Sequence, residues 1–238
     1  MRFEIMLENK FFELHSGSSD DKLSLLKIIT SPGYSVALNA EKLIACHKDS
    51  GLKAALCKAH LRVVDGASVT ALLRHQHSIK PKKLDLPKFL LALADQKSLK
   101  IDVIGATKEI NDRACSNIRK TYPNIKVNKS SHGYRDDEIL SQMIKGSDSD
   151  LIFLGLGSPR QELLACRVSP HSRGFIVCCG GALKVISGDV SDAPEVVKNS
   201  YFEWLFRLIL EPAKFLRVVR MLIQLNKVFS YKTRIRRC

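Results

Sequence analysis

Glycine-rich turns follow three of the predicted strands and carry the clearest chemical signal in the chain. These strands end at Gly105, at Gly155-Leu156-Gly157 and at Gly180-Gly181. When a parallel sheet is covered by helices, ligands bind at the carboxyl ends of its strands, where glycine allows backbone amides to approach a phosphate group. The chain has neither the GxGxxG fingerprint of dinucleotide-binding proteins nor the GxxxxGK(S/T) loop of nucleoside triphosphatases. The turns therefore predict a site for a phosphate-bearing ligand, and the glycines alone name no reaction.

The elements that must position these turns alternate between apolar runs and helical patterns. Strands are predicted at residues 36–38, 61–64, 99–104, 125–127, 150–154 and 174–178, after a first short strand in which Phe3, Ile5 and Leu7 alternate. Helices are predicted at residues 21–29, 107–120, 136–145 and 160–167, with further helices that open at Asn39, at Ser68 and after Gly181, and residues 77–87 are predicted to form a loop. Continuous apolar strands belong to parallel sheets that are buried on both faces. The predicted fold class is therefore α/β, a Rossmann-like, mostly parallel sheet covered by helices.

The composition is that of a globular protein with a large excess of positive charge. The 238 residues include 38 Lys and Arg against 24 Asp and Glu, a formal net charge of +14, and 45% are hydrophobic. No apolar run reaches the roughly 18 residues of a membrane-spanning helix, and Glu4 and Glu8 interrupt the first apolar stretch, which argues against a signal peptide. The seven cysteines include no CxxC pair, so we expect reduced cytosolic thiols rather than disulfides or a zinc site.

Half of the excess charge lies in the last 38 residues, where nine basic residues face only Glu203 and Glu211. At about 100° per residue on a helix, the basic residues share one broad face and large apolar residues fill the rest. Such a helix suits an anionic membrane surface or a lipid phosphate. An ordinary solvated helix face and a nucleic-acid contact are the alternatives. We therefore divide the chain into an α/β core, residues 1–195, and a basic amphipathic helical appendage that faces a membrane, residues 196–238.

One stretch of the chain resembles the signature of a known enzyme family. Residues 154–162, LGLGSPRQE, are similar to the GxGSPxQE signature of the WecG/TagA/CpsF glycosyltransferases, which form glycosyltransferase family 26. Further blocks agree in order and spacing at residues 36–42 (VALNAEK), 64–69 (VDGASV), 133–134 (GY), 180–182 (GGA), 193–194 (AP) and 203–212 (EWLFRLILEP). The resemblance extends over residues 34–225, which is most of the chain.

This resemblance implies an inverting, metal-independent hexosyltransferase that needs no cofactor. Such an enzyme moves an N-acetylmannosamine-type sugar from a UDP donor to N-acetylglucosamine linked to a polyprenyl diphosphate, during synthesis of bacterial cell-envelope polysaccharides. The partners implied are the UDP-sugar, the lipid-linked acceptor and the inner face of the cytoplasmic membrane, where the protein would be peripheral; self-association is left open. The AxNAEK block is closest to the WecG-like branch, which transfers N-acetylmannosaminuronic acid for enterobacterial common antigen.

The resemblance also implies roles for individual residues. Asp65 would be the base that takes the proton of the acceptor hydroxyl, with capping of the helix at Ser68 as the alternative. Asn39 would bind sugar hydroxyls or would only cap its helix, and Gln161 and Glu162 would lie beside the ligand or would form a solvated first turn. The remaining substrate-binding candidates are Gly105, Tyr134, Gly155, Gly157, Ser158, Gly180 and Gly181, together with Arg207, Arg217 and Arg220 for the departing diphosphate.

Several positions depart from the family pattern. Ala37 stands where many members have Thr, Lys83 where they have Gly, Lys184 where Asp is common, and Asp192 and Tyr201 replace Arg and Gly. A uronate donor would bring one more negative charge, which Lys80, Lys82, Lys83 or Lys184 would receive. The departures at Lys83 and Asp192 favour, as a second hypothesis, a degenerate member that binds a nucleotide sugar or a partner without transferring sugar.

Two further patterns are interpreted as having no metal or nucleic-acid role. Asp148-Ser149-Asp150 has the form of a metal-binding DxD, but it precedes its strand and lies at the wrong end of the sheet, so we predict a turn. His75 and His77 have no third ligand in view and are expected at the surface. Nucleic acid is not expected as a partner, because the chain has no aromatic and basic RNA motif and no helix-turn-helix signature.

Overall fold

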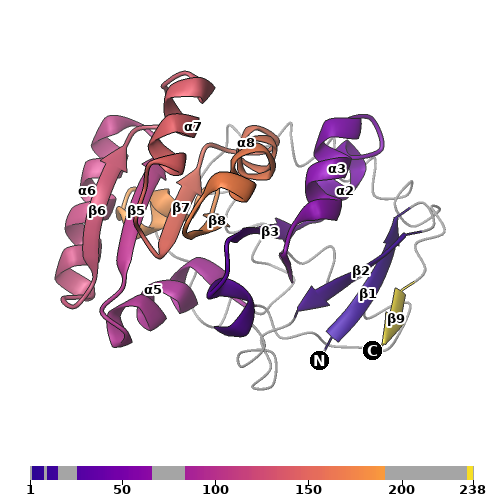
Figure 1. The fold of residues 1–238 in the computed structure, drawn as a ribbon, viewed down its shortest axis with the longest axis horizontal. Coiled ribbons are helices and arrows are strands. Elements are labelled where there is room, and N and C mark those ends of the chain that lie inside the picture. Colours follow the sequence, from indigo (N-terminus) through magenta and orange to yellow (C-terminus); the bar gives the residue numbers. More distant parts are fainter. Residues whose placement is uncertain (1, 8–9, 16–25, 66–83, 191–234, 238) are drawn as a thin grey trace.

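The computed structural model describes residues 2–7, 10–15, 26–65, 84–190 and 235–237. Within these residues, one nine-stranded sheet has the order β6-β5-β7-β8-β3-β4-β2-β1-β9 (Figure 1). Its strands are β1 (Arg2–Leu7), β2 (Lys10–His15), β3 (Gly33–Leu38), β4 (Leu61–Val64), β5 (Lys100–Gly105), β6 (Lys126–Ser131), β7 (Leu151–Gly155), β8 (Phe175–Cys178) and β9 (Ile235–Arg237). The six strands from β6 to β4 are all parallel, which confirms the predicted α/β sheet.

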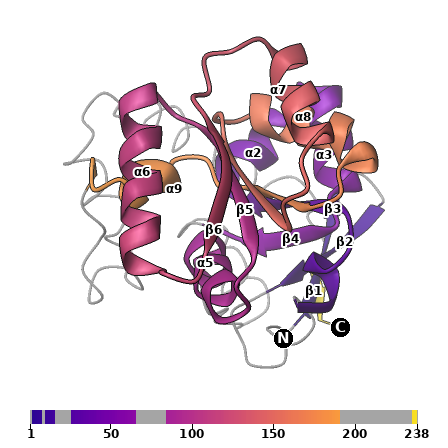
Figure 2. The same cartoon turned by 60° about the vertical axis from the view of Figure 1, so that its left-hand side comes forward.

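The helices cover both faces of this sheet. They are α2 (Ala40–Ala45), α3 (Ser50–Lys58), α5 (Leu86–Gln96), α6 (Lys108–Thr121), α7 (Asp137–Lys145), α8 (Arg160–Val168) and α9 (Ala182–Ile186), with a 3-10 turn at Ser169–His171. One core cluster joins α2, α3, α7 and α8 to one face, and a second joins α5, α6 and α9 to the other (Figure 2). Strand β7 serves both, since Ile152 and Leu154 face the first cluster while Leu151 and Phe153 face the second. Burial on both faces is the reason that these strands are continuously apolar.

The first and last described strands form the far end of the sheet. Strand β2 pairs in parallel with β4 through His15 and Val63, and β1 pairs antiparallel with both β2 and β9. The alternation of Phe3, Ile5 and Leu7 correctly predicted β1, whereas β2 was not predicted. Residues 235–237 of the proposed helical appendage form the strand β9 instead of a helix. The two ends of the chain therefore meet in one antiparallel ladder.

Local capping signals set several helix starts. Asn39 caps α2 as predicted, because its side-chain oxygen accepts the backbone N–H of Lys42 at 3.0 Å. Thr107 caps α6. Helix α5 was not predicted, because residues 77–87, which include Pro87, were assigned to a loop. Asp85 caps this helix and Pro87 lies in its first turn, where proline is tolerated since that N–H has no partner within the helix.

Candidate active site

The candidate site lies at the carboxyl edge of the parallel strands. Leu38 and Val64 are register partners at the ends of β3 and β4, so Asn39 and Asp65 are the next residues on two neighbouring strands. The backbone N–H of Asp65 donates to the carbonyl of Leu38 at 2.9 Å, and both Asn39 and Asp65 are half-buried. Parallel pairing thus brings the predicted base and the predicted sugar-binding amide to the same point of the sheet.

The cap of helix α2 uses only part of the Asn39 side chain. Its Oδ1 atom accepts from the N–H of Lys42, which confirms that Asn39 is a helix cap. The amide nitrogen is a donor and has no role in this cap. Capping therefore orients the Asn39 amide and is compatible with sugar binding by its nitrogen.

Two of the predicted site glycines are required by contacts between neighbouring turns. A Cβ atom on Gly105, whose φ is +140°, would lie 2.3 Å from the carbonyl oxygen of Gly155. A Cβ atom on Gly155 would lie 2.7 Å from Leu183 and 3.0 Å from the carbonyl oxygen of Gly180. Both residues are buried. Close packing of the turns after β5, β7 and β8 thus accounts for these two glycines without a ligand.

The other glycines of the edge have space for a side chain as far as the described residues are concerned. Among the described residues, a Cβ atom on Gly157 or Gly181 would have no heavy atom within 4 Å, and one on Gly180 would meet only the Gln161 side chain at 3.7 Å. Gly157 and Gly181 are exposed, and Ser158, which directly follows Gly157, is half-buried. Sequence alone does not separate these open glycines from the packed ones. The open part of the edge is therefore at the turns that precede α8 and α9.

Gln161 and Glu162 are buried in the first turn of α8, so the solvated alternative for these residues is wrong. Glu162 Oε1 accepts from Gln161 Nε2 at 2.8 Å and pairs with Lys42 Nζ at 2.8 Å. Gln161 Oε1 accepts the backbone N–H of Gly180 at 3.1 Å. Sequence reasoning missed Lys42; the available signal was its position in the first turn of a helix that follows a strand end.

Arg160 holds the loop that carries Tyr134. Its guanidinium donates to the carbonyl oxygens of Gly133 and Arg135, each at 2.6 Å, and pairs with Asp137 at 2.8 Å. Tyr134 is 78% exposed, so the loop does not use this ring to fill the core. An aromatic side chain that is held at the surface near the strand ends is suited to contact a ligand.

The motifs that build this edge are those of one known family. A model of the Glycosyl transferase WecG/TagA/CpsF family matches residues 14–237. The chain belongs to this family. The match covers nearly the whole chain and is to the family as a whole, so assignment to the WecG-like branch remains a prediction. Family membership makes the protein a glycosyltransferase of cell-envelope polysaccharide synthesis, with a nucleotide-sugar donor and a lipid-linked acceptor.

Several predicted residues of this glycosyltransferase lie outside the described part of the chain. They are Arg207, Arg217 and Arg220, the lysines 80, 82 and 83, Asp192, Tyr201, His75, His77 and the predicted helix that opens at Ser68. Lys184 is described and lies half-buried in α9. Within the described ranges, no helix is long and apolar enough to cross a membrane.

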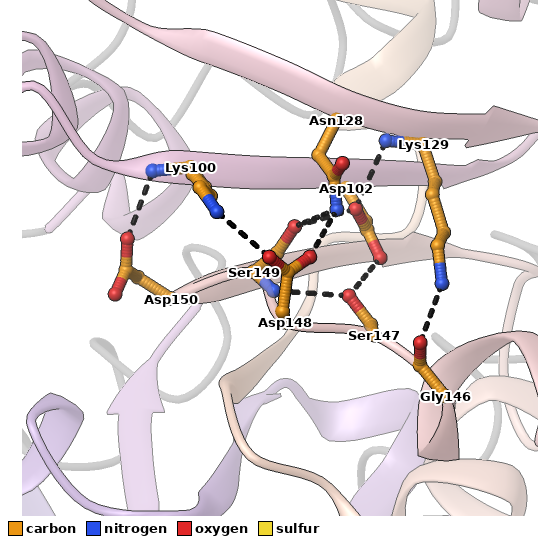
Figure 3. Close-up of polar contacts among 9 residues, drawn as sticks. All are labelled: Lys100, Asp102, Asn128, Lys129, Gly146, Ser147, Asp148, Ser149 and Asp150. Atoms are coloured by element: carbon orange, nitrogen blue, oxygen red, sulfur yellow. Dashed lines mark hydrogen bonds and ion pairs between the residues drawn. The ribbon is translucent and has the colours of Figure 1, made fainter.

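The DxD-like sequence of the glycosyltransferase lies at the opposite edge of the sheet, as predicted. Figure 3 shows Asp148 between Lys100 Nζ at 2.7 Å and Asn128 Nδ2 at 2.8 Å, while Asp150 accepts the backbone N–H of Lys100. The hydrogen bond between Lys100 and Asp148 lowers the pKa of the Asp148 carboxyl group. The same hydrogen bond raises the pKa of Lys100. These carboxylates stabilise the turn between α7 and β7. Across the described residues, no group of three or more His, Cys, Asp or Glu is placed to hold a metal.

The six described cysteines are free thiols, as predicted. Cys178 is the last residue of β8, Cys179 follows it directly before Gly180, and both are buried. Burial raises the pKa of Cys179 to about 12. Burial, followed by the Glu162 carboxylate, raises the pKa of Cys178 well above its usual range. Both thiols therefore stay protonated at neutral pH and are poor nucleophiles.

Proposed function

We propose that this protein transfers an N-acetylmannosamine-type sugar from a UDP donor to N-acetylglucosamine on a polyprenyl diphosphate, with inversion of the anomeric centre. The observation that carries the proposal is the pairing of Leu38 with Val64, which sets Asp65 beside Asn39 at the carboxyl edge. The open glycines Gly157 and Gly181 lie along the same edge and leave room for a nucleotide sugar. Membership of the family supplies the reaction class.

In the proposed mechanism, Asp65 acts as general base. Its carboxylate takes the proton of the acceptor hydroxyl while that oxygen attacks the anomeric carbon. The bond from this carbon to the UDP oxygen breaks on the opposite face, so the configuration inverts and UDP departs with the bonding electron pair. The amide nitrogen of Asn39 orients a sugar hydroxyl for this attack.

The departing diphosphate gains negative charge and requires cations or oriented amides. We assign this role to Arg207, Arg217 and Arg220, because a guanidinium binds two phosphate oxygens at once. The basic appendage that carries them would meet an anionic membrane surface, where the lipid-linked acceptor is held. For the donor we favour the uronate form, because the AxNAEK block resembles the branch that uses it and lysines at 80, 82, 83 and 184 would offset its charge.

A direct assay tests the proposal. Purified protein is incubated with radiolabelled UDP-N-acetylmannosamine or its uronate and a short polyprenyl-diphosphate N-acetylglucosamine acceptor, with and without EDTA. We expect transfer from at least one donor, unaffected by EDTA. Binding of UDP-sugar without transfer from either donor would contradict the proposal and support the degenerate, binding-only alternative.

A further inference from the structure

A buried ion pair joins the helices that follow β3 and β7. Lys42 Nζ lies 2.8 Å from Glu162 Oε1, and the two side chains are 8% and 0% exposed. The same ammonium donates to the carbonyl oxygen of Ala37 at 2.8 Å. Lysine and glutamate are seldom buried unless they are paired. The pair therefore fixes the start of α8 against the end of β3.

Hydrogen bonds extend this pair in both directions along the carboxyl edge. On one side, Glu162 Oε1 accepts from Gln161, whose own oxygen accepts the N–H of Gly180. On the other side, Ala37 precedes Leu38, whose carbonyl accepts the N–H of Asp65. The pair is thus the central link between the backbone that carries the proposed base and the open glycine turn after β8.

Stability alone does not explain this arrangement. Glu162 Oε2 is buried and has no hydrogen-bond partner among the described residues. A buried carboxylate with one oxygen unsatisfied keeps part of its desolvation penalty, and a well-packed apolar pair of similar volume is often as stable as a buried ion pair. The fixed direction of the Lys42–Glu162 contact is what an apolar pair would not supply.

We propose that Lys42 and Glu162 are positioning residues for sugar transfer, which hold the Gly180 turn in register with Asp65 and Asn39. This inference rests on the proposed function. The side chains of Lys42 and Glu162 are both buried, so Glu162 acts through its contacts with Gln161 and Lys42 and does not bind the substrate itself. Because the pair sets the distance between two parts of the site, its loss affects the rate of transfer more than the affinity for the donor.

The test compares single and double replacements. Glu162→Leu leaves a buried ammonium without its counterion and lowers the melting temperature. In Lys42→Met/Glu162→Leu, the apolar pair restores the melting temperature to near the wild-type value, while kcat stays at least about tenfold reduced and the donor KM changes little. If the double variant folds poorly, Glu162→Gln, which nearly keeps the shape of the side chain, replaces it in the test. It is expected to lower kcat while the donor KM changes little.

The matched control is Lys100→Met/Asp148→Leu, which removes a Lys–Asp ion pair of 2.7 Å at the opposite edge and leaves kcat and KM unchanged. Wild-type kcat in a stable double variant, or unchanged kcat in Glu162→Gln, overturns the inference. Amide hydrogen exchange gives a readout that does not depend on transfer. If the pair holds this turn, amide exchange at Gly180 becomes faster in the double variant. An unchanged exchange rate overturns the inference, even if the protein transfers none of the tested sugars. Absence of transfer would by itself reject the proposed function and not this inference.

Discussion

The two edges of the parallel sheet each bury a carboxylate, and they satisfy it in different ways. At the amino edge, Asp102 is fully buried and accepts from Ser147 Oγ at 2.5 Å, from Ser149 Oγ at 2.6 Å and from the Lys129 N–H at 3.0 Å (Figure 3). At the carboxyl edge, Glu162 has a cation and an amide on one oxygen and no partner among the described residues on the other.

The difference separates a fully hydrogen-bonded structural cluster from the edge at which we propose the sugar-transfer site. Neutral donors surround Asp102 and connect β5, β6 and the turn before β7. The carboxyl edge instead combines a buried charge pair, an acidic side chain at a strand end and turns with open glycines. An unsatisfied buried oxygen is not confined to the carboxyl edge, because Ser35 Oγ, in the first half of β3, also has no partner among the described residues. The unsatisfied charge of Glu162, rather than a missing hydrogen bond as such, distinguishes the edge of the proposed site.

The largest difference between the edges is expected from Asp65→Asn. Loss of the general base lowers the transfer rate by about 10²- to 10⁴-fold, whereas UDP affinity is largely retained because the carboxylate acts on the acceptor. Single-turnover transfer and UDP titration measure the two effects. Asp148→Asn makes the same change of charge at the amino edge and serves as the control, with wild-type turnover expected. Wild-type turnover in Asp65→Asn would reject the assigned base.

Asp102→Ala is expected to reduce stability and to leave the transfer rate unchanged. Two buried hydroxyls and one N–H lose their shared acceptor, so the free energy of unfolding falls by about 3 kcal/mol, while kcat per folded molecule is unchanged. Urea denaturation and transfer assays measure these quantities. Asp150→Ala, at an exposed position on the same edge, should lower the free energy of unfolding by less than Asp102→Ala does. A fall in kcat without a loss of stability would show that the two edges are coupled.

Alanine replacements distinguish the packed glycines from the open ones. Gly105→Ala introduces a methyl group against the Gly155 backbone at a left-handed φ, so we expect a loss of at least about 2 kcal/mol in unfolding free energy. Gly181 has a φ of −71° and space for a methyl group among the described residues, so Gly181→Ala should fold normally and weaken UDP-sugar binding. Denaturation and donor KM measure the two outcomes. An unchanged KM in Gly181→Ala would exclude this turn from the ligand site.

The effect that is smallest at neutral pH concerns the buried thiols at the carboxyl edge. The pKa of Cys179 is about 12 in the folded protein against an ordinary value of 9.0. The unfolded chain therefore releases this proton first, and stability present below pH 9 is lost between pH 9 and 12, by about 1.4 kcal/mol per unit for one thiol. Urea unfolding at several pH values should give a shallower decline above pH 9 for Cys179→Ala than for the wild type, with parallel curves between pH 7 and 8. Equal slopes above pH 9 would contradict this assignment.

The parallel sheet was predictable because burial on both faces leaves a direct trace in the sequence. Apolar runs located β4, β5, β7 and β8, and the predicted cap at Asn39 located the start of α2. Helix α5 was missed because proline breaks a helix interior yet fits a first turn, and only the cap at Asp85 distinguishes the two cases. Strands β2 and β9 depend on pairing with distant partners, which local periodicity does not report.

The edge at which we propose the site could be predicted from the sequence, but the contacts within that edge could not. The glycine turns predicted a site at the strand ends, and the family resemblance assigned Asn39, Asp65 and Gly180 to that site. The contact between Lys42 and Glu162 joins residues far apart in sequence, and no local pattern encodes it. Whether a glycine is packed, like Gly155, or open, like Gly181, likewise depends on neighbouring turns that are set only by the folded sheet.

The pairing of β9 with β1 has a consequence for the arginines at positions 207, 217 and 220. Residues 191–234 are connected at one end to α9 through Val190 and at the other end to β9, so both ends of this segment are anchored on the same sheet. Pairing of β9 with β1 places residues 235–237 on the same sheet as β3 and β4, the strands that precede Asn39 and Asp65. The proposed diphosphate contacts of Arg207, Arg217 and Arg220 would therefore come from a segment whose two flanking residues, Val190 and Ile235, both belong to the described fold.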